Sequence, residues 1–254
     1  MPTFNPLNMT GRTILVTGAS SGLGRETAIY LSRLGARIVL CGRDLARLEQ
    51  TSAAMEAGEH VLAPFDLTAM DDIPRWMLEL TEKTGPWHGL VHSAGVAGPK
   101  PIRIAAKKDF DNLMQINVGA AVALSRGFRQ KAVFSPGSSI VFLSSVAGLV
   151  GQPANALYSA TKGALLALAR SLALELAREN IRVNCVAPAM VMTEMGQKLR
   201  QTLTAENWAA IEAMHPLGMG QPEDVAGAIA FLLAPTGRWI TGTTIVTDGG
   251  YTAA

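Results

Sequence analysis

Residues 13–24 read Thr-Ile-Leu-Val-Thr-Gly-Ala-Ser-Ser-Gly-Leu-Gly, an apolar run that passes directly into a glycine-rich turn. The run is rich in β-branched residues and does not alternate in polarity, which is typical of a strand buried on both faces of a parallel sheet. A helical pattern follows, beginning near Gly22. The glycines allow a sharp turn and a close approach to an anion, at which the first N–H groups of the helix would point. The stretch predicts a strand, a phosphate-binding loop and a helix, with a mere tight connection as the alternative.

The same alternation continues along the chain. Further strands are expected over 37–40, 61–62, 90–91, 139–143, 182–186 and 244–246. Helices are expected over 25–34, 45–57, 72–84, 110–132, 157–179 and 223–233. Strict alternation implies right-handed βαβ units and an α/β fold, in which a doubly wound parallel sheet carries helices on both faces. Because no linker or charge block interrupts the pattern, we expect one domain over residues 1–254.

The composition excludes several classes of protein. The chain has 254 residues with a formal net charge of +2, 48% hydrophobic residues and 17% charged residues. So small a net charge argues against charge-driven binding of nucleic acid, and the apolar content argues against disorder. The first residues lack a basic stretch followed by an apolar core, and no apolar run approaches the ~20 residues of a membrane helix. We therefore expect no nucleic-acid partner, no secretory signal and no membrane span.

The cysteines and histidines suggest neither a disulfide framework nor a metal site. Cys41 and Cys185 are the only two cysteines, and both lie in apolar runs. We interpret them as buried, reduced thiols of a cytoplasmic protein. The four histidines are scattered without paired spacing, so no bound metal is expected.

The end of the second apolar run indicates which nucleotide the loop would bind. It reads Leu40-Cys-Gly-Arg43-Asp44. An NAD site usually has an acid here for the ribose 2′-hydroxyl, whereas an arginine accommodates the 2′-phosphate of NADP. Gly42 stands where the acid would be and Arg43 follows it, while Asp44 is interpreted as the N-cap of the next helix. The pattern favours NADP(H) over NAD(H), unless Arg43 is an ordinary solvated charge.

A second group of residues predicts proton-transfer chemistry. Tyr158 and Lys162 are four residues apart, so they share a helix face. A nearby ammonium favours the phenolate and lowers the pKa of the tyrosine toward neutrality, which suits proton exchange with an alcohol or carbonyl oxygen. Ser145 follows the strand 139–143, at the edge of the sheet where ligands collect, and its hydroxyl could hold the reacting oxygen. A lone Tyr-x-x-x-Lys proves little, but here it accompanies the glycine loop.

With these motifs the sequence resembles the short-chain dehydrogenase/reductase family, of the single-domain kind, over nearly its whole length. The matching motifs are Thr17-Gly-x-x-x-Gly-x-Gly24, Asp66-Leu67, Ala94-Gly95, Asn117, Ser145, Tyr158-x-x-x-Lys162, Asn184, Pro188, Thr193 and Asp248-Gly-Gly250. The resemblance implies a Rossmann-type sheet of seven strands and a nicotinamide cofactor. It implies Tyr158 as acid/base, Lys162 as ribose ligand and pKa shifter, and Ser145 as carbonyl holder. It also implies that Asn117 supports a proton-relay water.

The resemblance also implies cofactor contacts, with Asp66 at the adenine and the stretch from Pro188 to Thr193 at the nicotinamide. The expected cofactor-binding residues are Gly18, Ser20, Ser21, Gly22, Leu23, Gly24, Arg43, Asp66, Leu67, Ser93, Ala94, Gly95, Tyr158, Lys162, Pro188, Val191 and Thr193.

Two positions depart from the family pattern. The usual Asn-Asn-Ala-Gly reads His92-Ser-Ala-Gly95, and the usual Pro-Gly reads Pro188-Ala189. The first Asn normally braces the central sheet, which His92 could do with one ring nitrogen; a catalytic His92 is the alternative. The Cβ of Ala189 would narrow the space beside the nicotinamide or shift the loop. Because neither change removes an acid, base or nucleophile, we expect activity to survive.

In this family the segment at about 189–221 covers the substrate. Here it contains Trp208 and five of the 11 methionines, namely Met190, Met192, Met195, Met214 and Met219. Thioethers form an adaptable apolar wall that fits a hydrophobic or acyl substrate, and a helical pair packed on the body is the alternative. In the similar 3-oxoacyl-acyl-carrier-protein reductases, basic residues near the cleft receive the acidic carrier. Arg126, Arg129 and Lys131 are candidates for this, or for a solvated helix end that favours cations.

The expected function is an NADP(H)-dependent oxidoreductase that interconverts a ketone, with a 3-oxoacyl thioester as candidate, and a secondary alcohol. The alternatives are a sugar or alcohol dehydrogenase that works in the oxidative direction, and a non-catalytic NADP-binding sensor or scaffold. A sensor need not retain all of Asn117, Ser145, Tyr158 and Lys162. The helix over 157–179 is apolar nearly all round, and residues 225–234 with the tail 251–254 offer a second apolar surface. Two such surfaces predict a homotetramer with D2 symmetry.

Overall fold

One parallel sheet organises the protein, seen in a computed structural model that describes residues 5–253. The sheet has seven strands in the order β3-β2-β1-β4-β5-β6-β7, and each neighbouring pair is parallel. The strands are β1 Thr13–Thr17, β2 Arg37–Gly42, β3 Val61–Pro64, β4 Trp87–His92, β5 Phe134–Leu143, β6 Arg182–Pro188 and β7 Thr244–Thr247. The doubly wound α/β fold expected from the sequence is confirmed. Residues 1–4 and 254 of the expected domain and tail lie outside the described part.

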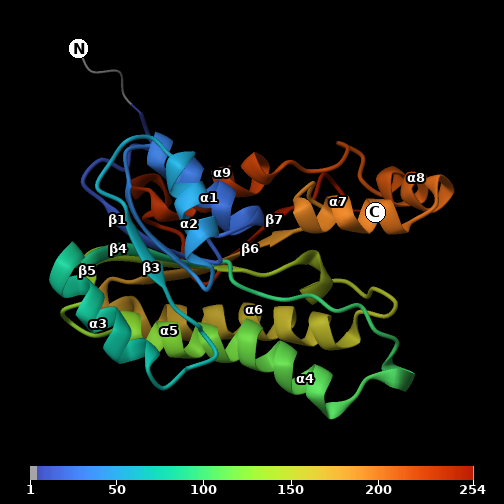
Figure 1. Ribbon diagram of the computed structural model, residues 1–254, viewed down its shortest axis with the longest axis horizontal. Coiled ribbons are helices and arrows are strands. Elements are labelled where there is room, and N and C mark those ends of the chain that lie inside the picture. The colour runs from blue at the N-terminus through green and yellow to red at the C-terminus, as the bar shows by residue number, and fades with distance from the viewer. Residues whose placement is uncertain (1–4, 254) are drawn as a thin grey trace.

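Helices cover both faces of the sheet (Figure 1). One face carries α1 Gly22–Arg33, α2 Leu45–Ala53 and α9 Pro222–Leu233. The other carries α3 Ile73–Thr84, α4 Lys107–Met114, α5 Ala120–Phe128 and α6 Ala156–Leu176. Short 3-10 turns occur at Ile102–Ile104, Val146–Gly148, Ala177–Glu179 and Pro235–Gly237.

Each strand contributes side chains to two separate cores, which explains its unbroken apolar sequence. In β1, Leu15 packs into the cluster beneath α3, α5 and α6, whereas Ile14 and Val16 pack into the cluster beneath α1 and α9. All five residues of β1 are buried. Burial of one such side chain contributes roughly 1.5–3 kcal/mol, so the central strands hold both helical layers in place.

The helix expected over 110–132 differs from the structure. It begins at Lys107, passes through a π-helical turn at Gln115–Gly119 and ends at Phe128. A π turn inserts one extra residue into the helix and shifts the direction of the side chains around it. Here the π turn accompanies the burial of the polar side chain of Asn117. A prediction of a regular helix gives no indication that this side chain is buried.

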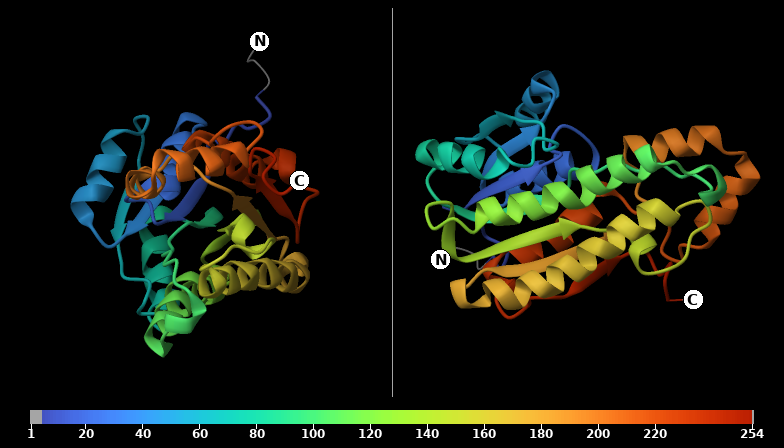
Figure 2. Two further views of the ribbon diagram at one scale, coloured as in Figure 1. Left: turned by 90° about the vertical axis from the view of Figure 1, so that its right-hand side faces the viewer. Right: turned by 90° about the horizontal axis from the view of Figure 1, so that it is seen from below.

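The segment at 189–221 forms the helical pair α7 Glu194–Thr202 and α8 Ala205–Ala213. Threonines cap both helices: Thr193 accepts from the N–H of Gly196, and Thr204 from that of Asn207. In Figures 1 and 2 the pair projects beyond the end of the sheet. The predicted segment is therefore a separate helical arm above the carboxyl ends of the strands.

Both cysteines are buried and free, as interpreted from the sequence. Burial raises the pKa of each thiol to about 12, so neither is a reactive thiolate at neutral pH. Across residues 5–253, no helix combines the length and the apolar character that a membrane crossing requires.

The prediction of an apolar surface over residues 225–234 is wrong for most of that stretch. Val225, Ile229 and Leu233 are buried in the core between α9 and the sheet. The exposed apolar groups of this region lie further along the chain, where Trp239 is 96% exposed and Val246 of the edge strand β7 is also exposed. The apolar sequence of α9 reflects contact with both α1 and the strands.

Candidate active site

The parallel strands deliver most of the expected site residues to one edge of the sheet. The phosphate loop follows β1, Arg43 follows β2, Asp66 follows β3 and the Ser93–Gly95 turn follows β4. Ser145 follows β5, and Val191 and Thr193 follow β6. Tyr158 and Lys162 come from α6, and Asn117 from the π turn. The structure thus brings together groups that the sequence spreads over 175 positions.

The phosphate loop is shaped by two glycines. Gly18 has φ +69°, and a Cβ there would lie 2.8 Å from the backbone nitrogen of Ala94. A Cβ at Gly24 would lie 2.4 Å from the carbonyl oxygen of Gly18. The loop therefore packs backbone against backbone, and it presents the N-terminus of α1, whose cap Ser21 makes no side-chain hydrogen bond. The N–H groups at the start of a helix fit the pyrophosphate of a dinucleotide.

The neighbouring strand ends fit the adenosine half of such a ligand. Arg43 is exposed, and Asp44 caps α2 by accepting from the N–H of Arg47 at 3.2 Å, as interpreted from the sequence. Asp66 accepts from the N–H and the hydroxyl of Thr68, and these bonds, with a smaller contribution from Arg43, lower the pKa of its carboxyl. Arg43 is thus an exposed cation close to the carboxylate of Asp66.

Asn117 joins two elements around the site through three side-chain hydrogen bonds. Its Oδ1 accepts from the N–H of Val96 at 2.8 Å, and its Nδ2 donates to the carbonyl of Val96 and to Oγ1 of Thr161, both at 3.0 Å. The amide is buried and these bonds engage both its ends. In this structure Asn117 therefore acts as a brace between the loop after β4 and α6.

Lys162 is a buried lysine held at the end of β5. Its Nζ donates to the carbonyl of Leu143 at 2.7 Å, and its own carbonyl accepts from the hydroxyl of Ser144. Burial lowers the pKa of Lys162 to about 8. A Cβ at Gly95 would lie 3.7 Å from Nζ, so a glycine leaves room beside the ammonium. A buried lysine with a strongly shifted pKa is typical of functional sites.

Tyr158 and Ser145 lie in contact, but the pKa of the tyrosine differs from the sequence expectation. Burial raises the pKa of Tyr158, and the hydrogen bond with Ser145 lowers it only in part. Lys162 Nζ lies 5.5 Å from the centre of the phenol ring and is bonded to Leu143 instead. The expected lowering toward neutrality is therefore wrong for this structure, because desolvation of the phenolate outweighs the distant ammonium.

His92 links strand β1 to the π turn through its two ring nitrogens. Its Nε2 lies 3.4 Å from the carbonyl oxygen of Asn117, and its Nδ1 lies 3.1 Å from Oγ1 of Thr17. Because a carbonyl only accepts, Nε2 carries the proton and Nδ1 accepts from the threonine. Burial, followed by the charge of Lys162, lowers the pKa of His92 to about 4. The buried neutral imidazole thus acts as the sheet brace that the family resemblance implied.

The remaining cofactor candidates border the arm. The carbonyl of Pro188 accepts from the hydroxyl of Ser145 at 3.4 Å, and Ala189 donates its N–H to Thr247. A cavity of about 250 Å³ lies between the phosphate loop and α7, lined in part by Gly22, Arg25 and Thr193. Over residues 5–253, no three histidine, cysteine or acidic side chains are grouped as metal ligands.

The methionines of the arm do not form one wall. Met192 and Met219 line a cavity of about 520 Å³ together with the buried Trp208, whereas Met195 and Met214 are exposed. Arg200 lies over the ring of Trp208 at 5.5 Å. The lining of this cavity also includes the charged residues Arg200 and Glu212. The methionines in the sequence therefore predicted only the apolar part of the lining.

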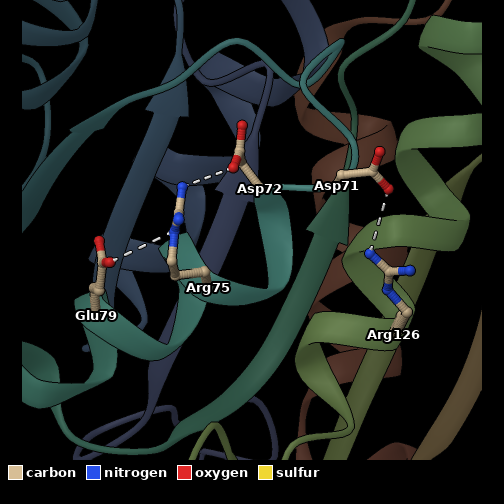
Figure 3. Close-up of polar contacts among 5 residues, drawn as sticks. All are labelled: Asp71, Asp72, Arg75, Glu79 and Arg126. Carbon is tan, nitrogen blue, oxygen red and sulfur yellow. Dashed lines mark hydrogen bonds and ion pairs between the residues drawn. The ribbon is translucent and has the colours of Figure 1, made fainter.

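The basic cluster near the end of α5 is not brought to the site. Arg126 faces Asp71 at 3.9 Å, as Figure 3 shows, and Arg129 pairs with Glu179 at 2.9 Å. The end of α5 leads into the start of β5, so it lies at the amino edge of the sheet, opposite the carboxyl edge that gathers the site. These arginines fit the alternative of a solvated, ion-paired helix end.

Three residues outside the expected catalytic and cofactor-binding sets complete the site. Thr161 holds Asn117, Thr17 joins His92 to the N–H of Ala94, and Glu194 accepts from the N–H of Gly22 at 2.9 Å. Thr161 lies within the Tyr-x-x-x-Lys motif and Thr17 opens the glycine motif, so their positions in the sequence already indicated that they lie near the site. Nothing local signals the contact of Glu194, which joins residues 172 positions apart.

Known proteins resemble this chain over almost its full length. A family model described as Enoyl-(Acyl carrier protein) reductase matches residues 18–252. The chain is 34% identical over 256 residues to a tropinone reductase homolog of Arabidopsis thaliana. The aligned region covers 99% of this chain and 96% of that protein. It is 33% identical over 245 residues to the 3-oxoacyl-acyl-carrier-protein reductase of Rickettsia prowazekii, with coverage of 96% and 98%.

Solved structures share the fold as well. A chain from Sinorhizobium meliloti described as a short-chain alcohol dehydrogenase gives a TM-score of 0.92 at 30% identity, covering 98% of this chain and 100% of that one. Another, from Beutenbergia cavernae, is described as an NAD(P)-dependent gluconate 5-dehydrogenase with NADP bound at low occupancy. It gives a TM-score of 0.89 at 30% identity, with the same coverage.

The depressed pKa of His92 predicts a pH-dependent contribution to stability. Between pH 6.5 and about 4 the unfolded chain binds a proton that the folded imidazole does not, so stability falls as the pH drops through this window. From pH 7 to pH 5 the loss should be about 2 kcal/mol. Urea unfolding at both pH values should show that His92→Asn removes a difference of this size. An unchanged pH dependence in the variant would mean that His92 is not buried as the neutral form.

Proposed function

This chain belongs to the short-chain dehydrogenase/reductase family and is an oxidoreductase that acts on CH–OH groups, and we propose that it uses NADP(H) to reduce a ketone to a secondary alcohol. One observation carries the proposal. Ser145 interacts with the phenol of Tyr158, and the ammonium of the buried Lys162 lies 5.5 Å from the centre of that ring. Such a group of residues can hold a carbonyl oxygen and protonate it.

The chemistry divides between the cofactor and the chain. When bound, the nicotinamide supplies the hydride. Tyr158 gives its proton to the carbonyl oxygen, and Ser145 orients that oxygen by donating a hydrogen bond. Lys162, whose ammonium donates to the carbonyl of Leu143, would bind the ribose of the bound cofactor. Asn117 and His92 are positioning residues, because they hold the surrounding loop and helix through buried hydrogen bonds.

The protonated form of Tyr158 fits the role of acid in a reduction. Burial raises the pKa of Tyr158 further above neutrality, so the phenol carries the proton that a general acid requires. A sugar or alcohol dehydrogenase would need the phenolate as base, although the similarity to a chain described as a gluconate 5-dehydrogenase keeps that alternative open. A sensor or scaffold explains neither the buried lysine nor the contact between two hydroxyls.

Two features support NADP(H) over NAD(H). Arg43 is exposed at the end of β2 and close enough to Asp66 to lower the pKa of that carboxyl. Gly42, which precedes it, offers no carboxylate to bind a ribose 2′-hydroxyl. A guanidinium binds a phosphate through two charge-assisted hydrogen bonds, which a hydroxyl cannot match.

The substrate we propose is a small-molecule ketone, with a 3-oxoacyl thioester as candidate from the similarity to the Rickettsia protein. Because Arg126 and Arg129 are ion-paired at the opposite edge of the sheet, a carrier protein would have to be recognised elsewhere. For the protein itself we propose a cytoplasmic setting.

We propose a homotetramer built on two apolar surfaces. On the side of α4, α5 and α6, Phe110, Val122 and Leu174 are exposed, Leu174 to 83%. At the sheet edge, Trp239 and Val246 are exposed. Each surface can pair with its own copy around a two-fold axis, and two such axes give D2 symmetry.

The role of Tyr158 is tested by Tyr158→Phe, which removes one oxygen and keeps the ring. Single-turnover NADPH oxidation with a reducible ketone should slow by about 10²–10⁴-fold, the loss expected for a positioned acid. NADPH binding, followed by fluorescence, should persist. Tyr30→Phe is the matched control, since Tyr30 lies on α1 against α9, and it should keep the wild-type rate. If Tyr158→Phe retains most of the rate, the proposed mechanism is wrong.

Cofactor preference is tested by Gly42→Asp and its neutral control Gly42→Asn. A Cβ here would lie 3.2 Å from Leu48 Cδ2 and 3.3 Å from Ser20 Oγ, both side-chain atoms that can shift. The added carboxylate should repel the 2′-phosphate and move the ratio of kcat/KM for NADPH over NADH by about tenfold or more. Gly42→Asn should keep the NADPH preference. Equal kcat/KM for both cofactors in the wild type would refute the role of Arg43.

The oligomer is tested by light scattering at micromolar concentration. The wild type should have four times the 26.8 kDa mass of the chain. Leu174→Asp should reduce this mass by half, because a buried unpaired charge disfavours one of the two interfaces. A wild-type mass equal to that of the monomer would contradict the proposal.

A further inference from the structure

A carboxylate from the arm lies on the phosphate loop. Oε2 of Glu194 accepts from the backbone N–H of Gly22 at 2.9 Å. Gly22 is the first residue of α1, and Glu194 is the first residue of α7. The contact therefore joins the start of the cofactor-binding helix to the start of the arm.

The first turn of α1 attracts an anion that α1 itself does not supply. It contains no acidic residue, and the N-cap Ser21 makes no side-chain hydrogen bond. A 12-residue helix concentrates positive partial charge at this end, which favours a carboxylate or a phosphate. Glu194 thus satisfies, from a distant element, an N–H of the helix N-terminus that fits the pyrophosphate of the cofactor.

The backbone of Glu194 is fixed while its carboxylate remains displaceable. Thr193 caps α7 through the N–H of Gly196 and donates its own N–H to the carbonyl of Val191 at 2.8 Å. The glutamate side chain is exposed and borders the cavity of about 250 Å³ between the loop and α7. An exposed charge-assisted hydrogen bond is weak enough for a more highly charged ligand to replace.

We propose that Glu194 is an internal competitor for the pyrophosphate position, and that it latches α7 to the phosphate loop until the cofactor displaces it. Two consequences follow. The apparent affinity for the cofactor is reduced by the fraction of molecules in which the latch is closed. Binding of the cofactor also releases the first turn of α7 from α1, so the cofactor must bind before the arm can adjust over a substrate. The inference rests on the proposed function for the location of the pyrophosphate.

The test is the dissociation constant of NADPH, measured by fluorescence for the wild type and for Glu194→Gln and Glu194→Ala. Both variants should bind NADPH about five- to tenfold more tightly, as expected if about nine-tenths of the wild-type molecules are latched. Glu206→Gln is the matched control, because it removes the same charge from the first turn of the neighbouring helix α8. It should leave the dissociation constant unchanged.

A second ligand separates the latch from general electrostatics. Adenosine 2′-monophosphate carries the adenine and the 2′-phosphate but has no group for the N-terminus of α1. Its affinity should be the same for the wild type and for Glu194→Gln. Weaker or unchanged NADPH binding by the Glu194 variants would overturn the latch, as would an equal gain for both ligands. If no nicotinamide nucleotide binds to the wild type, the proposed function itself fails.

Discussion

The parallel alignment of all seven strands is the constraint on which the rest of the structure depends. It directs every carboxyl strand end to one edge, so loops from residues 18 to 193 meet there. The order of the strands reverses between β1 and β4, and a crevice opens at such a switch point. The phosphate loop and the Ser93–Gly95 turn lie on its two sides, and Gly18 lets them approach. The position of the site is thus a consequence of topology before any side chain is considered.

Buried polar groups then fix the geometry at that edge. His92, Asn117 and Lys162 are each more than nine-tenths buried, and each bonds to a backbone carbonyl of another element. Burying a polar group without a hydrogen-bond partner costs free energy, so the members of this network cannot move far from their partners. The same low polarity that orders the network also raises the pKa of Tyr158. Rigidity and the raised pKa of the phenol therefore have one physical cause.

The sequence was sufficient to predict the strands, the glycine turn between β1 and α1, and the placement of Tyr158 and Lys162 on one helix, because each depends on local pattern or fixed spacing. The sequence was insufficient where a side chain's contacts are set by elements far away in the chain. The π turn at Asn117 forms with bonds to Val96 and Thr161, and the contact of Glu194 with Gly22 links residues 172 positions apart in the sequence. The sense of the pKa shift of Tyr158 depends on burial and on the direction of Lys162, neither of which spacing reveals. The separation of Arg126 from the site follows from helix direction, not from composition.

Burial raises the pKa of Tyr158 and so keeps its phenol a proton donor up to a higher pH than an exposed tyrosine. Spectrophotometric titration of the tyrosines measures this directly, since the chain has only three. The difference between the wild type and Tyr158→Phe isolates the ionisation of one ring. The account predicts that Tyr158 ionises at a higher pH than an unburied tyrosine. Ionisation of that ring near neutral pH would contradict it.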